Sequence, residues 1–284
     1  LENRNLMLNA LLESATRIAK EADINIIAVI TKSELDVDLE GFDIVMAPKK
    51  YATVLDSLIY YFEESPEKVI AEKFSYMYRT REYLSTLLYF KGFEFEKAVA
   101  VIDTDSLKGI IVVDPEKSAV FRAIEECAER IDPEAFKAAL AISLNIANKG
   151  REGRKIGTAF VMGDVEEVLK RSSQLIINPF QGHDEKERDM KNPETWESIM
   201  EFAQLDGVFI VDERGIIISA GRYIESSARD LSLRFRFGLG GRHIACASIT
   251  KETKAIAVVV SESGGDITVY KDGVELLHIP SLLL

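Results

Sequence analysis

The sequence contains few of the residues from which metal centres and disulfide frameworks are built. Its 284 residues include two cysteines, Cys127 and Cys246, and three histidines, His183, His243 and His278. The cysteines form no C-x-x-C pair, and the histidines lack the spacing of a zinc site. These absences exclude a zinc-finger or disulfide-rich fold, and they favour a protein of the reducing cytoplasm.

The sequence also lacks long apolar runs and an excess of positive charge. Runs such as IAVVV, which starts at Ile256, are far shorter than the roughly 18 residues of a membrane span, and from the sequence we expect no signal peptide. The formal net charge of -12 disfavours a general nucleic-acid surface or an anionic membrane surface. We therefore expect a small-molecule partner, with no nucleic acid and no membrane.

The spacing of apolar residues in the first half predicts a small α/β domain. Apolar residues recur at helical spacing from Leu8 to Ala22, and the β-rich run INIIAVI follows. Apolar runs at 43–47, 97–102 and 109–113 indicate buried strands of a mostly parallel sheet. Two further helices, at 117–130 and 133–149, are separated by the Asp132-Pro133 pair. We place the domain boundary there, which gives domains of residues 1–131 and 132–284.

The second half has the pattern of an α/β domain with a mixed central sheet flanked by helices. Strands are expected within 155–164 and 174–178, and two hairpins are expected from GVFIV-DERG-IIISA and ITVYKDGVELL. Asp164 is placed to cap a helix that begins at Val165. Asn192 and Pro193 are placed to start the next helix.

A glycine-rich stretch, GLGGRHIACAS, runs from Gly238 to Ser248. It is neither a G-x-G-x-x-G fingerprint nor a P-loop. Gly240 and Gly241 lead into RHIAC, which has the pattern of a first helical turn, and free amides there bind phosphate. The arginines that crowd this region are Arg229, Arg234, Arg236 and Arg242. They suit a polyphosphate, although a solvated basic face balanced by the many carboxylates, with His243 as a helix-end hydrogen bonder, is the alternative.

Two further polar pairs lie at strand ends. Asp206 and Gly207 directly precede the strand expected at 208–211, where a carboxylate can reach a metal or a substrate hydroxyl. Ser261 and Glu262 end the strand expected at 255–260. Both pairs have an alternative interpretation as ordinary turn residues.

Three motifs, DGV, GRH and SESGG, follow one another in this order, and with them the sequence resembles the diadenylate cyclase domain, which makes cyclic di-AMP from two molecules of ATP. The resemblance covers about Pro133 to the end and includes EGRKIGTAFVMGD. The sequence departs from the family motifs at Val208, Ile244 and Ser263. Ile244 stands in place of a second arginine, for which Arg236 or Arg234 is the expected substitute.

The resemblance implies catalytic roles for Asp206, Arg242, His243 and Glu262. It implies a divalent metal, Mn or Mg, held by Asp206 and Glu262, and ATP as the substrate. It further implies that cyclase domains associate face to face. The residues expected to contact the nucleotide are Thr158, Gly207, Ile224, Gly240, Gly241, Arg242, His243, Ile244, Ala245 and Ser261.

The first half resembles the C-terminal domain of pyruvate kinase, through ESATRIAKEADINIIAVITKS. This arrangement is similar to an archaeal type of diadenylate cyclase that places such a module before the cyclase domain. Two other functions stay open on the sequence alone. One is a nucleotide-binding sensor that has lost catalysis, and the other is a metabolite-regulated switch controlled by the first half.

Overall fold

The computed structural model describes residues 2–33, 39–60, 80–89, 91–93, 96–150, 154–225 and 240–281. The chain divides into two compact units, Leu1–Arg122 and Ala123–Leu284. The helix α4 (Ala119–Ala128) begins in the first unit and ends in the second. The predicted boundary at Asp132-Pro133 lies further along the chain, just before helix α5 (Pro133–Lys149).

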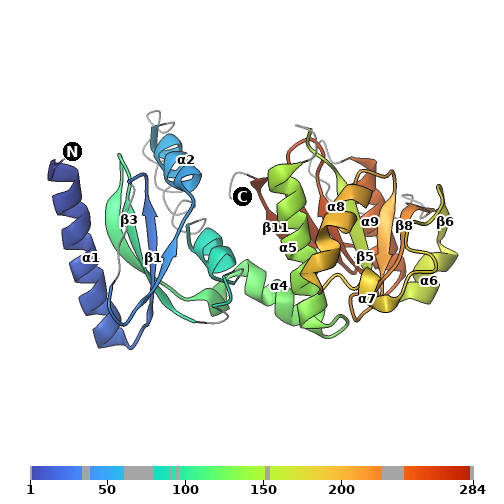
Figure 1. Cartoon of the computed structure of the whole chain (residues 1–284), viewed down its shortest axis with the longest axis horizontal. Coiled ribbons are helices and arrows are strands. Elements are labelled where there is room, and N and C mark those ends of the chain that lie inside the picture. The colour runs from blue at the N-terminus through green and yellow to red at the C-terminus, as the bar shows by residue number, and fades with distance from the viewer. Residues whose placement is uncertain are drawn as a thin grey trace. The chain divides into compact units, whose positions relative to one another are not determined.

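The first unit contains a four-stranded sheet in the order β2-β1-β3-β4 (Figure 1). Strand β1 pairs in parallel with both β2 and β3, and β4 is antiparallel to β3, which confirms the mostly parallel sheet. The strands are β1 (Ile26–Thr31), β2 (Asp43–Met46), β3 (Ala98–Asp103) and β4 (Lys108–Val113).

Helices lie on both faces of this first sheet. The stripe of Leu8, Leu12, Ala15 and Ala19 on α1 (Glu2–Ala22) is buried against Ile27, Val29, Val99 and Val101 of β1 and β3. These residues recur at three and four positions, so they share one face of the helix. Leu88, in a helix that covers 80–89, packs on the other face of the sheet with Ile26 and Ala98. The helix α2 (Lys49–Tyr60) and a one-turn 3-10 helix, η1 (Pro115–Lys117), complete the described elements of this unit.

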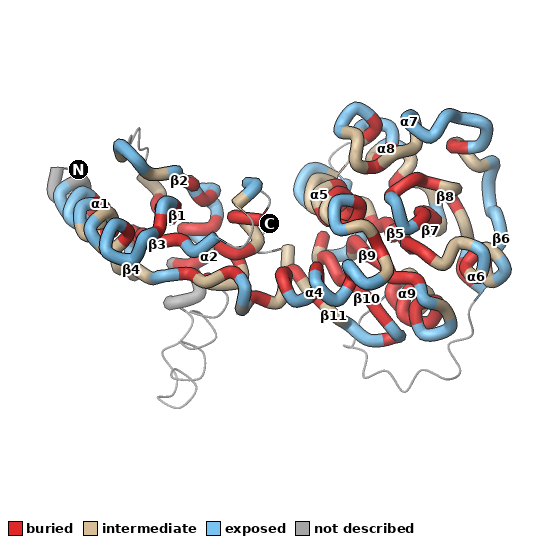
Figure 2. The backbone as a smooth tube through the Cα atoms, turned by 90° about the horizontal axis from the view of Figure 1, so that it is seen from below, coloured by how far each residue is buried: buried red, intermediate tan, exposed pale blue. Residues whose placement is uncertain are grey.

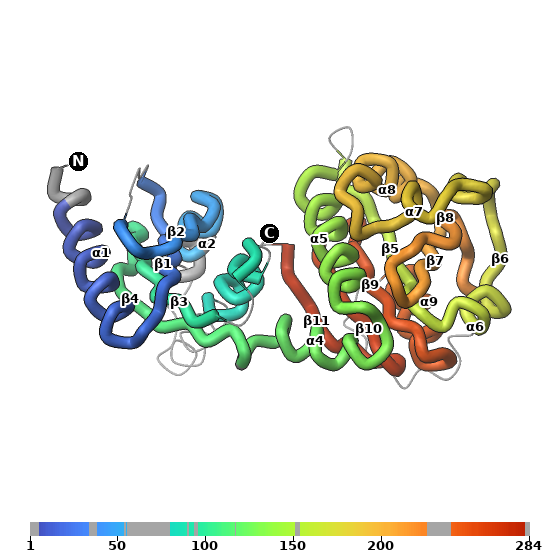
Figure 3. Tube along the Cα trace, turned by 60° about the horizontal axis from the view of Figure 1, so that its bottom comes forward, coloured from blue at the N-terminus to red at the C-terminus, as the bar shows by residue number. Residues whose placement is uncertain are grey.

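The second unit contains a seven-stranded sheet in the order β11-β10-β9-β5-β7-β8-β6 (Figure 3). Strands β5 and β7 are parallel and their other neighbours are antiparallel, which confirms the mixed sheet. Both predicted hairpins are present as β7-β8 and β10-β11. The strands are β5 (Thr158–Met162), β6 (Ser172–Gln174), β7 (Val208–Val211), β8 (Ile217–Ile224), β9 (Ile256–Val260), β10 (Ile267–Lys271) and β11 (Val274–Ile279).

Helices flank this sheet as predicted, with α5 and α8 on one side and α9 on the other (Figure 2). Helix α9 packs its Cys246, Ala247 and Ile249 against Ala159 of β5 and Val259 of β9. Helix α5 packs on β9 and β10. The helices are α6 (Val165–Lys170), α7 (Glu185–Arg188), α8 (Trp196–Phe202), α9 (Gly241–Glu252) and the 3-10 helix η2 (Pro193–Thr195).

Two local predictions need correction, and both concern polar side chains. Asp164 has a left-handed backbone, with φ 46°, and its carboxylate accepts a hydrogen bond from the Lys254 amide rather than capping its own helix. The strand expected at 174–178 lies earlier, as β6, which pairs with β8 and ends at Gln174. Beyond it the Asn178 side chain, rather than a strand ladder, bonds to the β8 backbone at Ile218 and Ala220. Asn192 does cap as predicted, with its side chain accepting from the Glu194 amide.

Both cysteines, Cys127 and Cys246, are buried free thiols, and burial raises the pKa of each to about 12. Within the described ranges, no helix is both long enough and apolar enough to cross a bilayer.

Candidate active site

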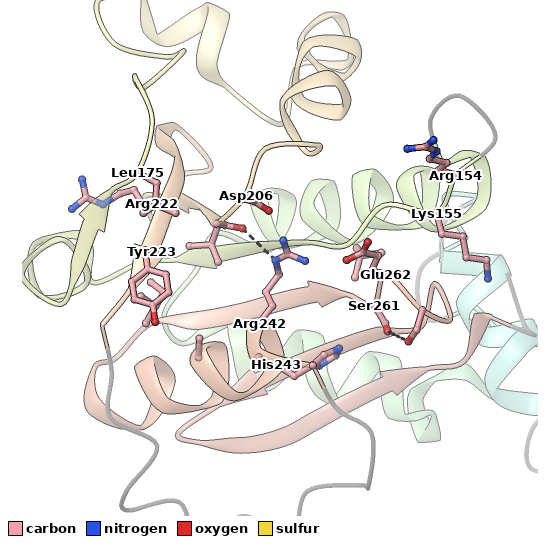
Figure 4. Close-up of a pocket in the computed structure, with 18 residues that line it drawn as sticks. Arg154, Lys155, Leu175, Asp206, Arg222, Tyr223, Arg242, His243, Ser261 and Glu262 are labelled. Atoms are coloured by element: carbon pink, nitrogen blue, oxygen red, sulfur yellow. Dashed lines mark hydrogen bonds between the residues drawn. The ribbon is translucent and has the colours of Figure 1, made fainter.

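A pocket of about 1080 Å³ in the second unit brings the three sequence motifs together (Figure 4). Its lining includes Asp206 and Gly207 before β7, Gly240 to His243 at the start of α9, and Ser261 to Ser263 after β9. Strand β5 lies between β7 and β9, parallel to the first and antiparallel to the second. The start of β7 and the end of β9 therefore meet at the same edge of the sheet, which is the start of β5.

The Asp206-Gly207 pair is a turn, and the turn holds the carboxylate at the pocket. Gly207 has φ 103°, and a Cβ atom there would lie 2.5 Å from the Arg222 carbonyl oxygen. Only glycine fits both the backbone conformation and this close approach. Asp206 itself is exposed at the pocket lining. The turn interpretation and the functional one are thus compatible.

Helix α9 begins at Gly241, as predicted, with its first turn at the pocket. Gly240 occupies the N-cap position, and no side chain caps the helix there. Among the described residues, a Cβ atom added to Gly240 or Gly241 would have no neighbour within 4 Å. The backbone of these two glycines is therefore not covered by the described part of the chain at the helix N-terminus, where an anion is favoured.

Arg242 lies in the middle of the pocket, between Asp206 and Glu262 (Figure 4). Its Nε donates to the Gly207 carbonyl oxygen at 3.3 Å. In the described part of the chain, no carboxylate forms an ion pair with it. The alternative of a solvated basic face concerned four arginines, of which only Arg242 lies within the described residues, so it stays open.

Gly157, just before β5, supports this position of Arg242. A Cβ atom at Gly157 would lie 2.7 Å from Arg242 Nη1, 2.8 Å from Glu262 Cβ and 3.0 Å from the Glu262 amide nitrogen. The missing side chain is the space in which the guanidinium and the Glu262 backbone approach each other. Sequence reasoning did not select Gly157, although a glycine at the start of a buried strand is a known sign of such a close approach.

His243 is buried and neutral at neutral pH. Burial, followed by the nearby His278 and Arg242, lowers the pKa of its imidazole to about 4. Its Nδ1 lies 3.2 Å from the Tyr270 hydroxyl, and its buried Nε2 has no hydrogen-bond partner among the described residues. If the Tyr270 hydroxyl donates to Nδ1, Nε2 carries the proton and is available as a donor.

The third motif is a tight turn with Glu262 exposed on it. The Ser261 amide donates to the Asp266 carbonyl, and the Gly265 amide donates to the Ser261 carbonyl. No group of three or more His, Cys, Asp or Glu side chains in the described ranges has the arrangement of a metal site. Asp206 and Glu262 both line the pocket, and carboxylate oxygens are ligands that a divalent cation prefers.

One end of the pocket is apolar. It is lined by Leu175, Val208, Tyr223, Ile224 and Ala245. Tyr223 is 56% exposed, whereas Ile224 is almost completely buried. The sequence analysis selected Ile224 and Ala245 but missed Leu175 and Tyr223. Leu175 reaches the pocket only because its segment lies beside β8, which no local pattern of the sequence shows.

Two of the predicted contact residues do not line the pocket. Thr158 is buried, and in the sheet it pairs with Val260 of β9. The next residue, Ala159, packs against α9. Because successive strand residues point to opposite faces, Thr158 points away from α9. Ile244, half-buried on α9, is also not part of the lining. Three predicted arginines, Arg229, Arg234 and Arg236, lie outside the described residues.

Two family models match parts of the chain. Residues 145–274 match the family described as DisA bacterial checkpoint controller nucleotide-binding, or DAC. Residues 10–116 match the probable sensor domain DacZ_A. That match does not confirm the resemblance of the first half to pyruvate kinase, which stays a prediction.

Two curated relatives are named diadenylate cyclase. The chain is 38% identical over 187 residues to that of Methanocaldococcus jannaschii, covering 63% of this chain and 59% of the relative. It is 33% identical over 177 residues to that of Haloferax volcanii, covering 62% and 63%. The chain thus spans about three fifths of the length of these relatives.

Two solved structures were also found at low similarity. A double cysteine mutant of DacA from Staphylococcus aureus aligns with a TM-score of 0.38 and 20% identity, over 52% of this chain and 87% of that one. A hypothetical membrane spanning protein from Bacillus cereus aligns with a TM-score of 0.36 and 13% identity, over 98% of both chains. At these scores neither structure bears on the site.

Proposed function

We propose that the protein is a diadenylate cyclase, which condenses two molecules of ATP into cyclic di-AMP and two pyrophosphates. One observation carries this proposal: a single pocket joins an exposed carboxylate, a helix N-terminus, an arginine that no described carboxylate pairs with, and an apolar end. The match of residues 145–274 to the DAC family and the two similar diadenylate cyclases support it.

The two ends of the pocket suit the two ends of ATP. Tyr223, with its exposed ring, and Ile224 offer an apolar surface on which a purine can stack or pack. The start of α9 and Arg242 then lie where the phosphates would be, because amide groups and a guanidinium both favour an anion.

The chemistry is two equivalent displacements. In each, the ribose 3'-hydroxyl of one nucleotide attacks the α-phosphorus of the other, the bond to pyrophosphate breaks, and the hydroxyl proton leaves. Asp206 is the carboxylate placed to orient the hydroxyl and accept that proton. Asp206 and Glu262 would also hold a divalent metal, Mg or Mn, which neutralises phosphate charge when bound.

Arg242 and His243 act as donors to phosphate oxygens in this proposal. Arg242 brings a positive charge that no carboxylate among the described residues compensates. His243 brings a neutral N–H at Nε2, because burial keeps its pKa near 4. Donors held in place by the fold stabilise charge that develops in the transition state without reorganising.

Face-to-face association of two protomers follows from the symmetry of the product. Two identical nucleotides joined by two equivalent bonds are made most simply when each protomer presents one ATP across a two-fold axis. An exposed apolar rim, Leu175 to Ile177, adjoins the pocket, and Ile177 is 91% exposed. Asn178 fixes this rim by bonding the backbone of Ile218 and Ala220. A second copy of the chain is the occupant that we propose for it.

The direct test is to incubate the protein with ATP and either Mg or Mn and to measure cyclic di-AMP by mass spectrometry. We expect the cyclic product and two pyrophosphates for each ring. ATP binding without any cyclic product, with either metal, would instead support a nucleotide-binding sensor. Asp206 argues against the sensor, because simple binding does not need a carboxylate at the attacking hydroxyl.

Gly241→Val tests whether phosphates bind at the start of α9. The added side chain would meet none of the described residues, so we expect the protein to fold normally while the affinity for ATP falls at least about tenfold, or about 1.4 kcal/mol. Isothermal titration with 3'-deoxy-ATP, which lacks the attacking hydroxyl, measures this affinity without turnover. Gly207→Ala is the contrasting variant, because its Cβ would clash with the Arg222 backbone and lower the melting temperature. An unchanged affinity in Gly241→Val would remove the phosphate-binding assignment.

Gly157→Ala tests whether the missing side chain positions Arg242. The new Cβ would displace the guanidinium and press on the Glu262 amide, so kcat should fall by roughly a hundredfold, as expected for a misplacement of about 1 Å. In an Arg242→Ala background the part of the loss that acts through Arg242 should disappear, which leaves only the smaller loss caused by the contact with Glu262. Gly109→Ala, in β4 with no atom within 4 Å of the added Cβ, is the matched control. An equal loss in both backgrounds would show that Gly157 does not act through Arg242.

A further inference from the structure

The end of the pocket opposite the apolar end is positively charged, and its basic residues have no role in the proposed reaction so far. Arg154 and Lys155 line it on the side opposite Leu175 and Tyr223 (Figure 4). Lys155 Nζ donates to the Gly264 carbonyl in the turn after β9, which ties the side chain to the Ser261–Ser263 side of the pocket. An ammonium group has three donors, so further donors remain for a ligand.

The positive charge of Arg154 and Lys155 has no carboxylate partner within the described part of the chain. In the described ranges, neither Arg154 nor Lys155 forms an ion pair with a carboxylate, although acidic residues outnumber basic ones by 47 to 35 in the whole sequence. Cations placed only for solubility in so acidic a chain would be expected to find carboxylates. Two unpaired cations at the wall of one pocket indicate an anionic ligand.

A third arginine of the pocket lining, Arg222, donates its hydrogen bonds to protein groups away from the proposed phosphate site. Arg222 donates to the Ser172 hydroxyl and carbonyl, to the Leu169 carbonyl and to the Gln174 side chain, all outside the phosphate-binding turn. In Figure 4 its guanidinium points away from Arg242. Burial also lowers its pKa, which agrees with a guanidinium packed into the protein. Among the described lining residues, this leaves Arg154, Lys155 and Arg242 as the cations available to a ligand.

We propose that Arg154 and Lys155 bind the outer two phosphates of ATP, which depart as pyrophosphate. This inference rests on the proposed function. With the base at Tyr223 and the α-phosphate at Arg242 and the start of α9, an extended triphosphate points toward the opposite end of the pocket. Arg154 and Lys155 therefore select for the triphosphate over the monophosphate, and they stabilise the leaving group.

The test compares two ligands that differ in their outer phosphates. Titration with 3'-deoxy-ATP and 3'-deoxy-AMP in the presence of Mg measures both affinities without turnover. We expect the double variant Arg154→Met/Lys155→Met to bind 3'-deoxy-ATP roughly ten- to hundredfold more weakly, the range of a charged hydrogen bond, and to bind 3'-deoxy-AMP like the wild type. Methionine keeps the unbranched apolar stem of both residues. Lys170→Met, on exposed α6, is the matched control.

Two results would overturn this inference while leaving the proposed function standing. One is an unchanged affinity of the double variant for 3'-deoxy-ATP. The other is an equal loss for both ligands, which would show a general effect on the pocket rather than contact with the outer phosphates. Failure of the wild-type protein to bind 3'-deoxy-ATP would instead overturn the proposed function, and this inference with it.

Discussion

Asp206→Asn is expected to reduce cyclic di-AMP formation by at least about a thousandfold, within the range of general base catalysis. Asparagine keeps the shape of the side chain but cannot accept the hydroxyl proton and is a poorer ligand for a divalent metal. Asp206 is exposed at the pocket and has no buried packing role, so the variant should fold like the wild type. Product measured at saturating ATP gives the loss in kcat.

Binding of 3'-deoxy-ATP separates catalysis from affinity in this variant. Arg242 and the start of α9 are unchanged, so the nucleotide should still bind. Asp23→Asn, at an exposed turn of the first unit, is the matched change of charge outside the pocket and should leave turnover unaltered. Near-normal turnover in Asp206→Asn would rule out Asp206 as the residue that activates the hydroxyl.

Mixing the Asp206→Asn protein with wild type extends this prediction to the assembly. A mixed dimer supports at most one of the two attacks, so the ring does not close. The activity per wild-type molecule should therefore fall as the inactive variant is added, provided that subunits exchange. Activity that is independent of the added variant after exchange would contradict a shared active site.

Ile177→Asp is expected to abolish activity by a different route, through loss of the dimer. An apolar anchor at the centre of an interface contributes about 2 kcal/mol or more, so a carboxylate there should weaken association at least about thirtyfold. Ile177 is 91% exposed in the single chain, and its replacement removes no internal packing. At low protein concentration the variant should bind 3'-deoxy-ATP and make almost no cyclic di-AMP.

The control for Ile177→Asp is the same change on the opposite edge of the sheet. Val274 is 57% exposed on β11, whereas the apolar rim follows β6 at the other edge (Figure 3). Val274→Asp should keep both the dimer and the activity. Sedimentation velocity reports the mass, and product formation over a dilution series reports the function. A wild-type monomer with constant specific activity on dilution would exclude the face-to-face dimer.

The local pattern of the sequence was sufficient to predict most helices and strands. Helix α5 begins at Pro133 after Asp132, whose side chain accepts a hydrogen bond from the Glu134 amide, and it ends before Gly150. The two hairpins also occur where the turn residues predicted them. These features depend on neighbours a few residues apart, which the sequence displays directly.

The sequence also determined which motifs are candidates for chemistry, and the structure decided what surrounds them. Arg154 and Lys155 reach the pocket from before β5, and Tyr223 reaches it from β8, so only the pairing of distant strands brings them together. Glycine at position 157 is needed only because the Arg242 side chain, which is distant in sequence, approaches it closely. The neutral state of His243 likewise results from its burial, with its ring against Tyr270 of β10. Close approach and desolvation act between segments that are far apart in the chain, and they arise only when the sheet is assembled.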